Sequence, residues 1–515
     1  MSVSLLQRLT RPLRDLFLQL TRKGDADRVS VSIGFVDTGS AVDLTTPLEK
    51  RLGRERVFAD LHQIATRNVD SRIVELETEE IENAGIRSIR LPWDKRRETV
   101  VPYWEPVDFA PDRRLFAEAI RQVGESYLQL GTLRPINIDL SVRKSPSNTN
   151  LGLPSLTRDK TRVIEYRDRA ANLKDPEDVF PSFGWWRAKV VGLVKPIDPG
   201  RLVWGFDHAE TYFSSRFLHP AIGVLRGMAE HAAWGGPEHV DDVVLNWIRP
   251  FALNRQGFHF ISVDYSGFDT SVSREAIEAV FSIWEKQFPG HVQQLRLIKE
   301  IFATSGLVTP DGWITGRNKA VPSGTAVTNW FDGVWNRIII RYSALKRRAE
   351  ERHTVQGDDA LIATNLRLEH LVEDSLELGM KVSDDKTLES QDTAHYLRRL
   401  YLMDKGTPGI YPMCRAASSL TGYERYDRDG WDQYHEALRN IMLVNNSEHH
   451  PRFEEEVQYL YENDRVLQSE DPVAVAKKAG NLDKAIRSLG RAFTGSGYEN
   501  LKGCLLYTSP SPRDS

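Results

Sequence analysis

Four acidic residues stand where strands of the chain are expected to end. In "FHFISVDYSGFDT", Asp264 follows a strand-like apolar run and Asp269 comes five residues later. In "HTVQGDDALIATN", Asp358 and Asp359 lie between two short apolar runs, where Gly357 favours a hairpin turn. If the two strands are neighbours, the carboxylates of Asp264 and Asp358 converge, and converging acids need a cation. Two Mg²⁺ ions, about 4 Å apart, would bridge them and serve phosphoryl transfer, with Asp269 over an incoming sugar.

Further polar residues lie between these acids in the stretch "VPSGTAVTNWFD". They are Ser323, Gly324, Thr328 and Asp332. A flexible glycine loop that opens a helix would let all four face the pocket of the acids. The gaps of 59 residues from Asp264 to Ser323 and 35 from Ser323 to Asp358 leave room for a helix with a loop and then a long helix. Downstream, "SDDKT" offers Lys386, a cation able to protonate a leaving pyrophosphate as a general acid.

Each of these features alone also fits a purely structural role. Gly-Asp-Asp is good hairpin-turn chemistry, and an aspartate at a strand end is common. The four features in this order are difficult to explain as structure alone, so the sequence favours a catalytic site.

The elements that must position these groups follow from the apolar pattern. The strand before Asp264 breaks at Ser266-Gly267, and Ser273 is placed to cap a helix whose apolar stripe follows. A long helix is predicted over 326–348 and two short strands over 353–364. A helix ended by Gly379, a short strand from Lys381 and the turn "SDDKT" come next. This order predicts an α+β fold with a small antiparallel sheet backed by helices on one face.

Composition places the chain among globular proteins. It has 515 residues, 40% hydrophobic and 27% charged, which is enough for about two to four substructures. No apolar run of about eighteen residues exists, so we expect no membrane insertion. The Arg-rich N-terminus lacks a continuous apolar core, which favours a surface helix over a secretory signal or a mitochondrial transit segment. Two cysteines, Cys414 and Cys504, build no disulfide framework or cysteine-rich zinc site and indicate a reducing compartment.

The last residues do not read as part of a fold. "CLLYTSPSPRDS", residues 504–515, matches a translated transposase adapter of the kind used in sequencing libraries. We therefore expect 504–515 not to be native.

Charge is uneven along the chain. The net charge is −4, yet residues 141–201 hold twelve Lys or Arg against seven Asp or Glu. A solvated face and a nucleic-acid surface are about equally good readings of such a stretch.

Read in order, the chemical stretches resemble motifs A to D of viral RNA-dependent RNA polymerases. They are "DYSGFD", "PSGTAVTNWFDGVWN", "QGDD" and "LGMKVSDDKT". The second runs S-G-x3-T-x3-D and then reaches Asn336, which is most similar to picobirnavirus polymerases and next to those of partitiviruses. The resemblance implies template-directed transfer of nucleoside monophosphates to the 3′-hydroxyl of growing RNA, with two Mg²⁺ ions for which Mn²⁺ can substitute.

The resemblance also assigns roles to residues. Asp264 and Asp358 would hold metal with Asp359 supporting, and the ribose would be checked by Asp269, Ser323, Gly324, Thr328 and Asp332. "PSNTNLGLP" resembles motif G at the template entrance, and the residues implied in template contact are Arg143, Lys144, Asn150, Gly152 and Pro154. "GRLVWG" resembles the end of motif F, which makes Arg201 the triphosphate contact. Gly200 stands where a basic residue is usual, so Lys195, Lys189 or Arg187 would supply that charge. "AHYLRRLYL" stands where motif E, the grip on the nascent strand, is expected.

The implied fold is a right hand of fingers, palm and thumb. The expected divisions are 1–254 (N-terminal region and fingers), 255–288 (palm, motif A), 289–318 (fingers insertion), 319–402 (palm, motifs B to E) and 403–503 (thumb). The implied partners are RNA template, nascent RNA, ribonucleoside triphosphates and a viral capsid protein. The implied location is the virion interior and the host cytoplasm, and the implied task is replication of a double-stranded RNA genome.

Two other functions are open at this stage. A reverse transcriptase shares the palm, but it would carry a bulky aromatic residue where this chain has Asp269 and an aromatic residue where it has Gly357. A non-catalytic RNA-binding virion protein with a decayed palm is the other alternative, although the acids, the Ser-Gly loop and Lys386 are all present.

Overall fold

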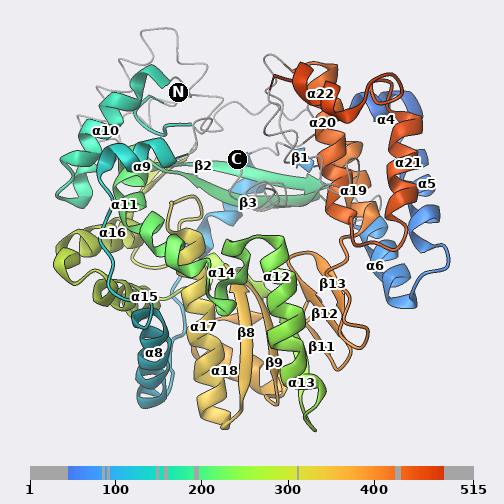
Figure 1. The fold of residues 1–515 in the computed structure, drawn as a ribbon. Helices are drawn as coiled ribbons and strands as arrows, with labels where there is room; N and C mark the ends of the chain where they lie inside the picture. The colour runs from blue at the N-terminus through green and yellow to red at the C-terminus, as the bar shows by residue number, and fades with distance from the viewer. Residues whose placement is uncertain are drawn as a thin grey trace.

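The described part of the computed structural model holds a five-stranded sheet, a four-stranded sheet and two two-stranded sheets, with helices around them (Figure 1). The residues it describes are 45–83, 87–89, 93–145, 150–155, 160–190, 197–309, 312–423 and 431–480. The expected N-terminal surface helix, Lys195 and the tail 504–515 lie outside these ranges.

The central sheet has four antiparallel strands in the order β11-β4-β9-β8. They are β4 (His259–Val263), β8 (Glu351–Gln356), β9 (Asp359–Thr364) and β11 (Leu388–Ser390). Gln356 pairs with Asp359, so β8 and β9 form the predicted hairpin with a two-residue turn. Val263 pairs with Ala360, which sets the end of β4 beside that turn.

Both faces of the central sheet are buried. Successive side chains of a strand point to opposite faces, so Ile261 and Ile362 join one core and Phe260 and Leu361 join another. The first face is covered by α8 (Arg113–Leu128), α15 (Arg274–Gln287), α17 (Thr328–Arg347) and α18 (Leu368–Glu377). The second is covered by α12 (Pro237–Val243), α13 (Arg249–Leu253), β12 (Thr393–Tyr396) and β13 (Arg399–Leu402). The sequence predicted helices on only one face of the sheet, whereas both faces are covered.

The local elements around the acids agree with the sequence pattern. Ser273 caps α15 by accepting a hydrogen bond from the Ala276 amide at 3.1 Å. Helix α17 fills most of the predicted 326–348, and α18 ends two residues before Gly379. The short strand from Lys381 is β10 (Lys381–Val382), which pairs with β5 (Tyr265–Ser266). The short helix α14 (Phe268–Ser271) follows β5.

A second sheet lies beside the first. Its strands are β1 (Arg87–Ile89), β2 (Ser182–Val190), β3 (Ile197–Gly205), β6 (Leu307–Thr309) and β7 (Gly312–Ile314). Helices α7 (Trp93–Arg96) and α16 (Val292–Thr304) contact this sheet. Helices α9 (Ile138–Lys144), α10 (Val163–Ala171) and α11 (His208–Leu225) pack on one another. Strand β6 pairs in parallel with β2, so the segment after α15 returns to this sheet before the chain enters α17.

The two ends of the described chain share one helical core, visible as blue and orange-red helices side by side (Figure 1). The early helices are α4 (Pro47–Leu52), α5 (Arg54–Thr66) and α6 (Ser71–Glu82). The late helices are α19 (Met413–Leu420), α20 (Gln433–Val444), α21 (Phe453–Asn463) and α22 (Pro472–Lys478). Fully buried Val57 and Leu61 of α5 pack in the same cluster as Ala417 and Ile441. Across the described ranges, no helix is both long and apolar enough to cross a membrane.

Candidate active site

The acids predicted from the sequence meet at one edge of the central sheet. Asp264 directly follows Val263, and Val263 pairs with Ala360, the residue after Asp359. The turn between β8 and β9 consists of Gly357 and Asp358, so both acids of the pair lie at the hairpin tip beside the end of β4. Asp264, Asp358 and Asp359 are all partly exposed, which leaves their carboxylates accessible from outside.

Lys386 reaches the same point from the turn after β10. Its Nζ lies 3.6 Å from Oδ1 of Asp264, and 68% of the lysine side chain is exposed. The turn itself is fixed to β4, because the Ser383 amide donates to the Asp264 carbonyl at 2.8 Å and the Thr387 hydroxyl donates to it at 3.3 Å. Such an exposed ion pair is weak, so the pairing with Asp264 does not fix the Lys386 side chain in one position.

The tip of the hairpin is also held from α17. Nδ2 of Asn336 donates to the carbonyl oxygens of Asp358 at 3.0 Å and Gly357 at 3.3 Å. The hydroxyl of Tyr265, the residue after Asp264, donates to Oδ1 of Asn336 at 3.2 Å. Sequence reasoning noted Asn336 only as part of a motif. Its spacing of four residues from Asp332 and eight from Thr328, which puts the three on one helix face, was the available signal.

Asp269 and the Ser-Gly loop form the side of the site next to these acids. The Ser323 hydroxyl donates to Oδ2 of Asp269, and the Val321 amide donates to the Asp269 carbonyl at 2.7 Å. Thr328 closes the loop from the first turn of α17, since its hydroxyl lies 2.9 Å from that of Thr325. Asp332, one turn further along the same face, is buried with 2% of its surface exposed.

Close backbone approaches join this loop and the predicted motif G loop to the end of β3. A Cβ on Gly324 would lie 2.1 Å from the carbonyl oxygen of Trp204, and the Trp204 amide donates to the Ser323 carbonyl at 2.7 Å. A Cβ on Gly152 would lie 2.1 Å from the carbonyl oxygen of Phe206. Both positions require glycine, because any side chain would collide with backbone.

The rest of the predicted motif G loop is anchored to the helices beside it. Oδ1 of Asn150 accepts from the Gly152 amide at 2.9 Å, and the Tyr166 hydroxyl donates to the Gly152 carbonyl at 3.1 Å. Pro154 is buried. Arg143 and Lys144 are exposed in the last turn of α9, which packs on α10 and α11.

The predicted triphosphate residues lie on the β2–β3 ribbon. Arg187 and Arg201 are direct cross-strand partners, and Lys189 pairs with Asp198. The side chains of these residues are not among those described, and neither is any part of Lys195. The backbone thus brings Arg187 and Arg201 together three residues before the Trp204 contact with the Ser-Gly loop.

Arg317, which sequence reasoning missed, holds the segment just before the Ser-Gly loop through hydrogen bonds to backbone carbonyls. Its guanidinium is 2% exposed and donates to the carbonyls of Phe302 at 2.5 Å, Lys319 at 2.7 Å and Ala320 at 2.9 Å. It also lies over the Trp204 ring, 4.9 Å from the centroid. Burial lowers the pKa of Arg317 to about 9. A single arginine flanked by glycine and asparagine carries no local signal of such a role.

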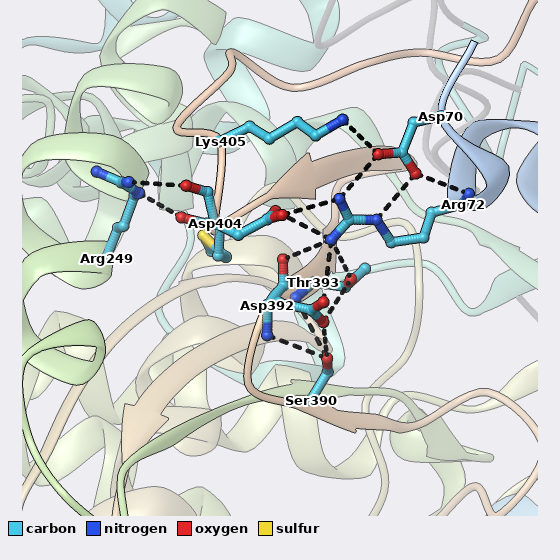
Figure 2. A network of polar contacts seen from close by, with 9 residues as sticks. Asp70, Arg72, Arg249, Ser390, Asp392, Thr393, Asp404 and Lys405 are labelled. Carbon is cyan, nitrogen blue, oxygen red and sulfur yellow. Dashed lines mark hydrogen bonds and ion pairs between the residues drawn. The ribbon is translucent and has the colours of Figure 1, made fainter.

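An ionic network ties α6 to the β12–β13 hairpin, the predicted motif E (Figure 2). Nη1 of Arg72 lies 2.9 Å from Oδ1 of Asp404 and 3.2 Å from Oδ2 of Asp392, and Nη2 lies 2.9 Å from Oδ2 of Asp70. Lys405 pairs with Asp70 at 2.5 Å. Hydrogen bonds from Arg72 and Lys405 hold the pKa of Asp70 well below its usual range. Asp392 precedes β12 and Asp404 follows β13, and Thr393 pairs with Leu402, so α6 holds the hairpin at its open end, away from its turn.

The donor chemistry of the acid edge suits a hard cation. Carboxylate oxygens are preferred by Mg²⁺, which typically takes only one or two protein carboxylates and completes its shell with substrate phosphates and water. Among the residues that the structure describes, no three His, Cys, Asp or Glu side chains are gathered as a metal cage. Asp264, Asp358 and Asp359 supply carboxylates of this kind at the acid edge.

An antiparallel sheet with an acid at one strand end, paired acids at the adjoining hairpin tip and a glycine loop before a long helix defines the palm of a right-hand polymerase. Comparison with known proteins shows which kind of polymerase the chain resembles. A family model described as viral RNA-dependent RNA polymerase matches residues 249–463. Over 471 residues the chain is 23% identical to a potential RNA-dependent RNA polymerase of human picobirnavirus (strain Human/Thailand/Hy005102/-), covering 86% of each protein. These matches support the function of a viral RNA-dependent RNA polymerase, and the chain is similar to a polymerase of a picobirnavirus over most of its length.

Solved structures show the same fold over almost the whole chain. The crystal structure of the RNA-dependent RNA polymerase of a human picobirnavirus superposes with a TM-score of 0.75 at 20% identity, covering 93% of this chain and 95% of that one. Its insertion-loop deletion mutant gives 0.74 at 20% identity, covering 89% and 94%. These structures confirm the expected right-hand fold. The family match and the curated relative support the RNA-dependent polymerase function expected from the motifs.

Proposed function

We propose that the acid edge is the catalytic centre, with Asp264 and Asp358 as ligands of two Mg²⁺ ions and Asp359 as their supporting neighbour. Polymerases of this family use divalent metals, and Mn²⁺ is a suitable substitute because it accepts the same oxygen ligands. When bound, the ions would lower the pKa of the attacking 3′-hydroxyl and neutralise charge on the triphosphate. The convergence of the β4 end and the β8–β9 tip is the observation that carries this assignment.

The surrounding residues would position the nucleotide. Asp269, held by Ser323, would accept a hydrogen bond from the ribose 2′-hydroxyl, an interaction that a deoxyribonucleotide cannot make. Gly324, Thr328 and Asp332 would complete the ribose side of the pocket.

Basic side chains would bind the phosphates of the nucleotide. Arg201 and Arg187, cross-strand partners, would bind the triphosphate together with Lys195. Lys386 would hand a proton to the departing pyrophosphate, for which its place beside Asp264 is suitable.

The template would enter along the loop of Asn150, Gly152 and Pro154 beside Arg143 and Lys144, where positive charge is local in a chain that is negative overall. The β12–β13 hairpin would grip the nascent strand. We place the fingers within 1–254 and 289–318, the palm at 255–288 and 319–402, and the thumb at 403–503. The enzyme would copy a double-stranded RNA genome in the virion interior and the host cytoplasm, with a viral capsid protein as a further partner.

Asp358→Ala tests the assignment most directly. With Mg²⁺, an RNA template and ribonucleotides, wild-type protein should make labelled complementary RNA, and the variant should make none. Asp359→Asn should keep part of the activity, since Asp359 only supports the two proposed metal ligands. Asp242→Ala, an exposed acid on α12, is the matched control and should behave as wild type. Unimpaired synthesis by Asp358→Ala would show that the metal assignment is wrong, and no synthesis by wild type would favour the non-catalytic alternative.

A further inference from the structure

We propose that Asn336 is a positioning residue that sets the place of the catalytic hairpin, acting through a hydrogen-bonded chain that begins at Tyr265. The chain links the residue after Asp264 to the backbone of Asp358 without using the strand ladder. The inference rests on the proposed role of Asp358 as a metal ligand and goes beyond it by assigning the group that fixes its backbone.

The hairpin tip needs a donor from outside the sheet. In a two-residue turn the carbonyls of the turn residues point away from the ladder, and a buried carbonyl without a donor is costly. Gly357 is buried, and both its carbonyl and that of Asp358 accept from the single amide group of Asn336. Asn336 is fully buried, so water does not compete for these bonds.

The amide group is held in one orientation from its other side. Tyr265 donates its hydroxyl to Oδ1, which turns Nδ2 toward the hairpin. The tyrosine is 5% exposed, so water hardly competes for its hydroxyl. Tyr265 is itself fixed in β5, paired with Val382 of β10.

The chemistry singles out asparagine at this position. The residue must accept one hydrogen bond and donate to two carbonyls, which an amide can do and which an ionised carboxylate or an apolar side chain cannot. Helix α17 is packed along its whole length in the main core, so its position is fixed. The Asn336 amide therefore holds the backbone of the hairpin tip at a fixed place relative to α17. Removing the donors would release the backbone of Asp358 without touching its carboxylate.

The experiment compares Asn336→Leu and Asn336→Asp, which keep approximate volume and remove the donors, with Tyr265→Phe, which removes only the hydroxyl. We expect kcat to fall about 10- to 100-fold in both Asn336 variants, because small misplacements of a catalytic group cost rates of this order. The KM for nucleotides should change less than about 2-fold, since the nucleotide contacts lie elsewhere. Tyr265→Phe should show the same pattern more weakly, and the double variant with Asn336→Leu should be no worse than Asn336→Leu alone.

A second measurement needs no activity. Hydrogen–deuterium exchange should rise in the peptide that spans the β8–β9 tip of the Asn336 variants and stay unchanged in the rest of α17. Tyr342→Phe is the matched control: it removes a buried hydroxyl of the same helix, bonded to Glu377 at 2.6 Å, and should lower stability without lowering kcat.

Two results would overturn the inference while leaving the proposed function intact. One is wild-type kcat in Asn336→Leu and Asn336→Asp while Asp358→Ala is inactive. The other is a loss of kcat in Tyr342→Phe as large as that in the two Asn336 variants. Such a loss would mean that the Asn336 variants lose activity through general destabilisation. Retained synthesis by Asp358→Ala would instead remove the proposed function on which the inference rests.

Discussion

Lys386 lies 3.6 Å from Asp264 yet keeps 68% of its side chain exposed. Its weak pairing suits a group that must turn from the acids to a leaving pyrophosphate. Lys386→Leu should lower kcat about 100-fold, the usual scale for losing a general acid, and leave the nucleotide KM nearly unchanged. Steady-state incorporation kinetics would measure both values.

Lys381→Leu is the matched control for Lys386, since Lys381 is an exposed lysine on the neighbouring β10. It should leave kcat unchanged. A large rise in KM for Lys386→Leu, with kcat preserved, would contradict the general-acid role and indicate a binding role instead.

The bond between Ser323 and Asp269 gives a second prediction for a single residue pair. Ser323→Ala should release Asp269 and reduce the preference for ribonucleotides over deoxyribonucleotides about 10-fold, the scale of one hydrogen bond to a charged group. Competition between the two nucleotide types on one template measures this preference. Ser343→Ala, which removes a buried bond to Asp374 from the same α17, should leave it unchanged. Equal incorporation by wild type would remove the proposed role of Asp269 and Asp332.

At the residue scale, the sequence predicted groups whose signal is local. The acids and Lys386 stand at strand ends and turns, and the short motifs there reveal both structure and chemistry. Arg317 was missed, and Asn336 was noted only within a motif, because their partners are carbonyl groups, which every residue carries. The side-chain geometry of Arg201 stays a prediction.

At the scale of elements, α6 holds the β12–β13 hairpin by an apolar and an ionic contact. Ile73 and Leu76 pack on Leu400 and Leu402, and Arg72 binds Asp392 and Asp404 at the open end of the hairpin. Arg72→Met should lower the free energy of unfolding by about 1–3 kcal/mol at pH 7, because charge-assisted hydrogen bonds are worth that much when partly buried.

This loss should depend on pH in a defined direction. The folded pKa of Asp70 is depressed by Arg72, so its stabilisation is present above the unfolded pKa near 4 and disappears as the pH falls toward the folded value. Denaturant unfolding of wild type and Arg72→Met should therefore converge as the pH drops from 7 to 3. Arg121→Met is the control, since Arg121 pairs with Glu118 and Glu125 while 53% exposed and should matter little. A gap that widens in acid would contradict this account of Asp70.

The elements themselves were largely predictable. The 3.6-residue pattern located α17 and α18, and the turn chemistry located the β8–β9 hairpin. The second helical cover of the sheet was not expected, although the apolar run "ALIA" and the largely apolar "FISV" are typical of strands buried on both faces. Pairing between distant segments, such as β6 with β2, has no local signal at all.

At the scale of the whole molecule, the early helices α4–α6 complete the core of the late helices α19–α22. Leu61 is fully buried there, so Leu61→Ala should cost about 2–5 kcal/mol of unfolding free energy. Hydrogen–deuterium exchange should rise in α19–α21 while the central sheet stays protected. Leu128→Ala, at an exposed position ending α8, is the control. Equal exchange gains in the central sheet would mean that the helical core and the palm unfold as one unit.

The shared core also dictates an order of events during synthesis. Helices α4–α6 leave the ribosome long before the apolar partners they need, which lie more than 300 residues further along the sequence. Contacts at such separation close late and slowly, because the loop between them must be ordered first. The growing chain therefore carries an unsatisfied apolar helix face until the region from α19 onward is made. A polymerase truncated before α21 should consequently aggregate even though every catalytic residue is already present.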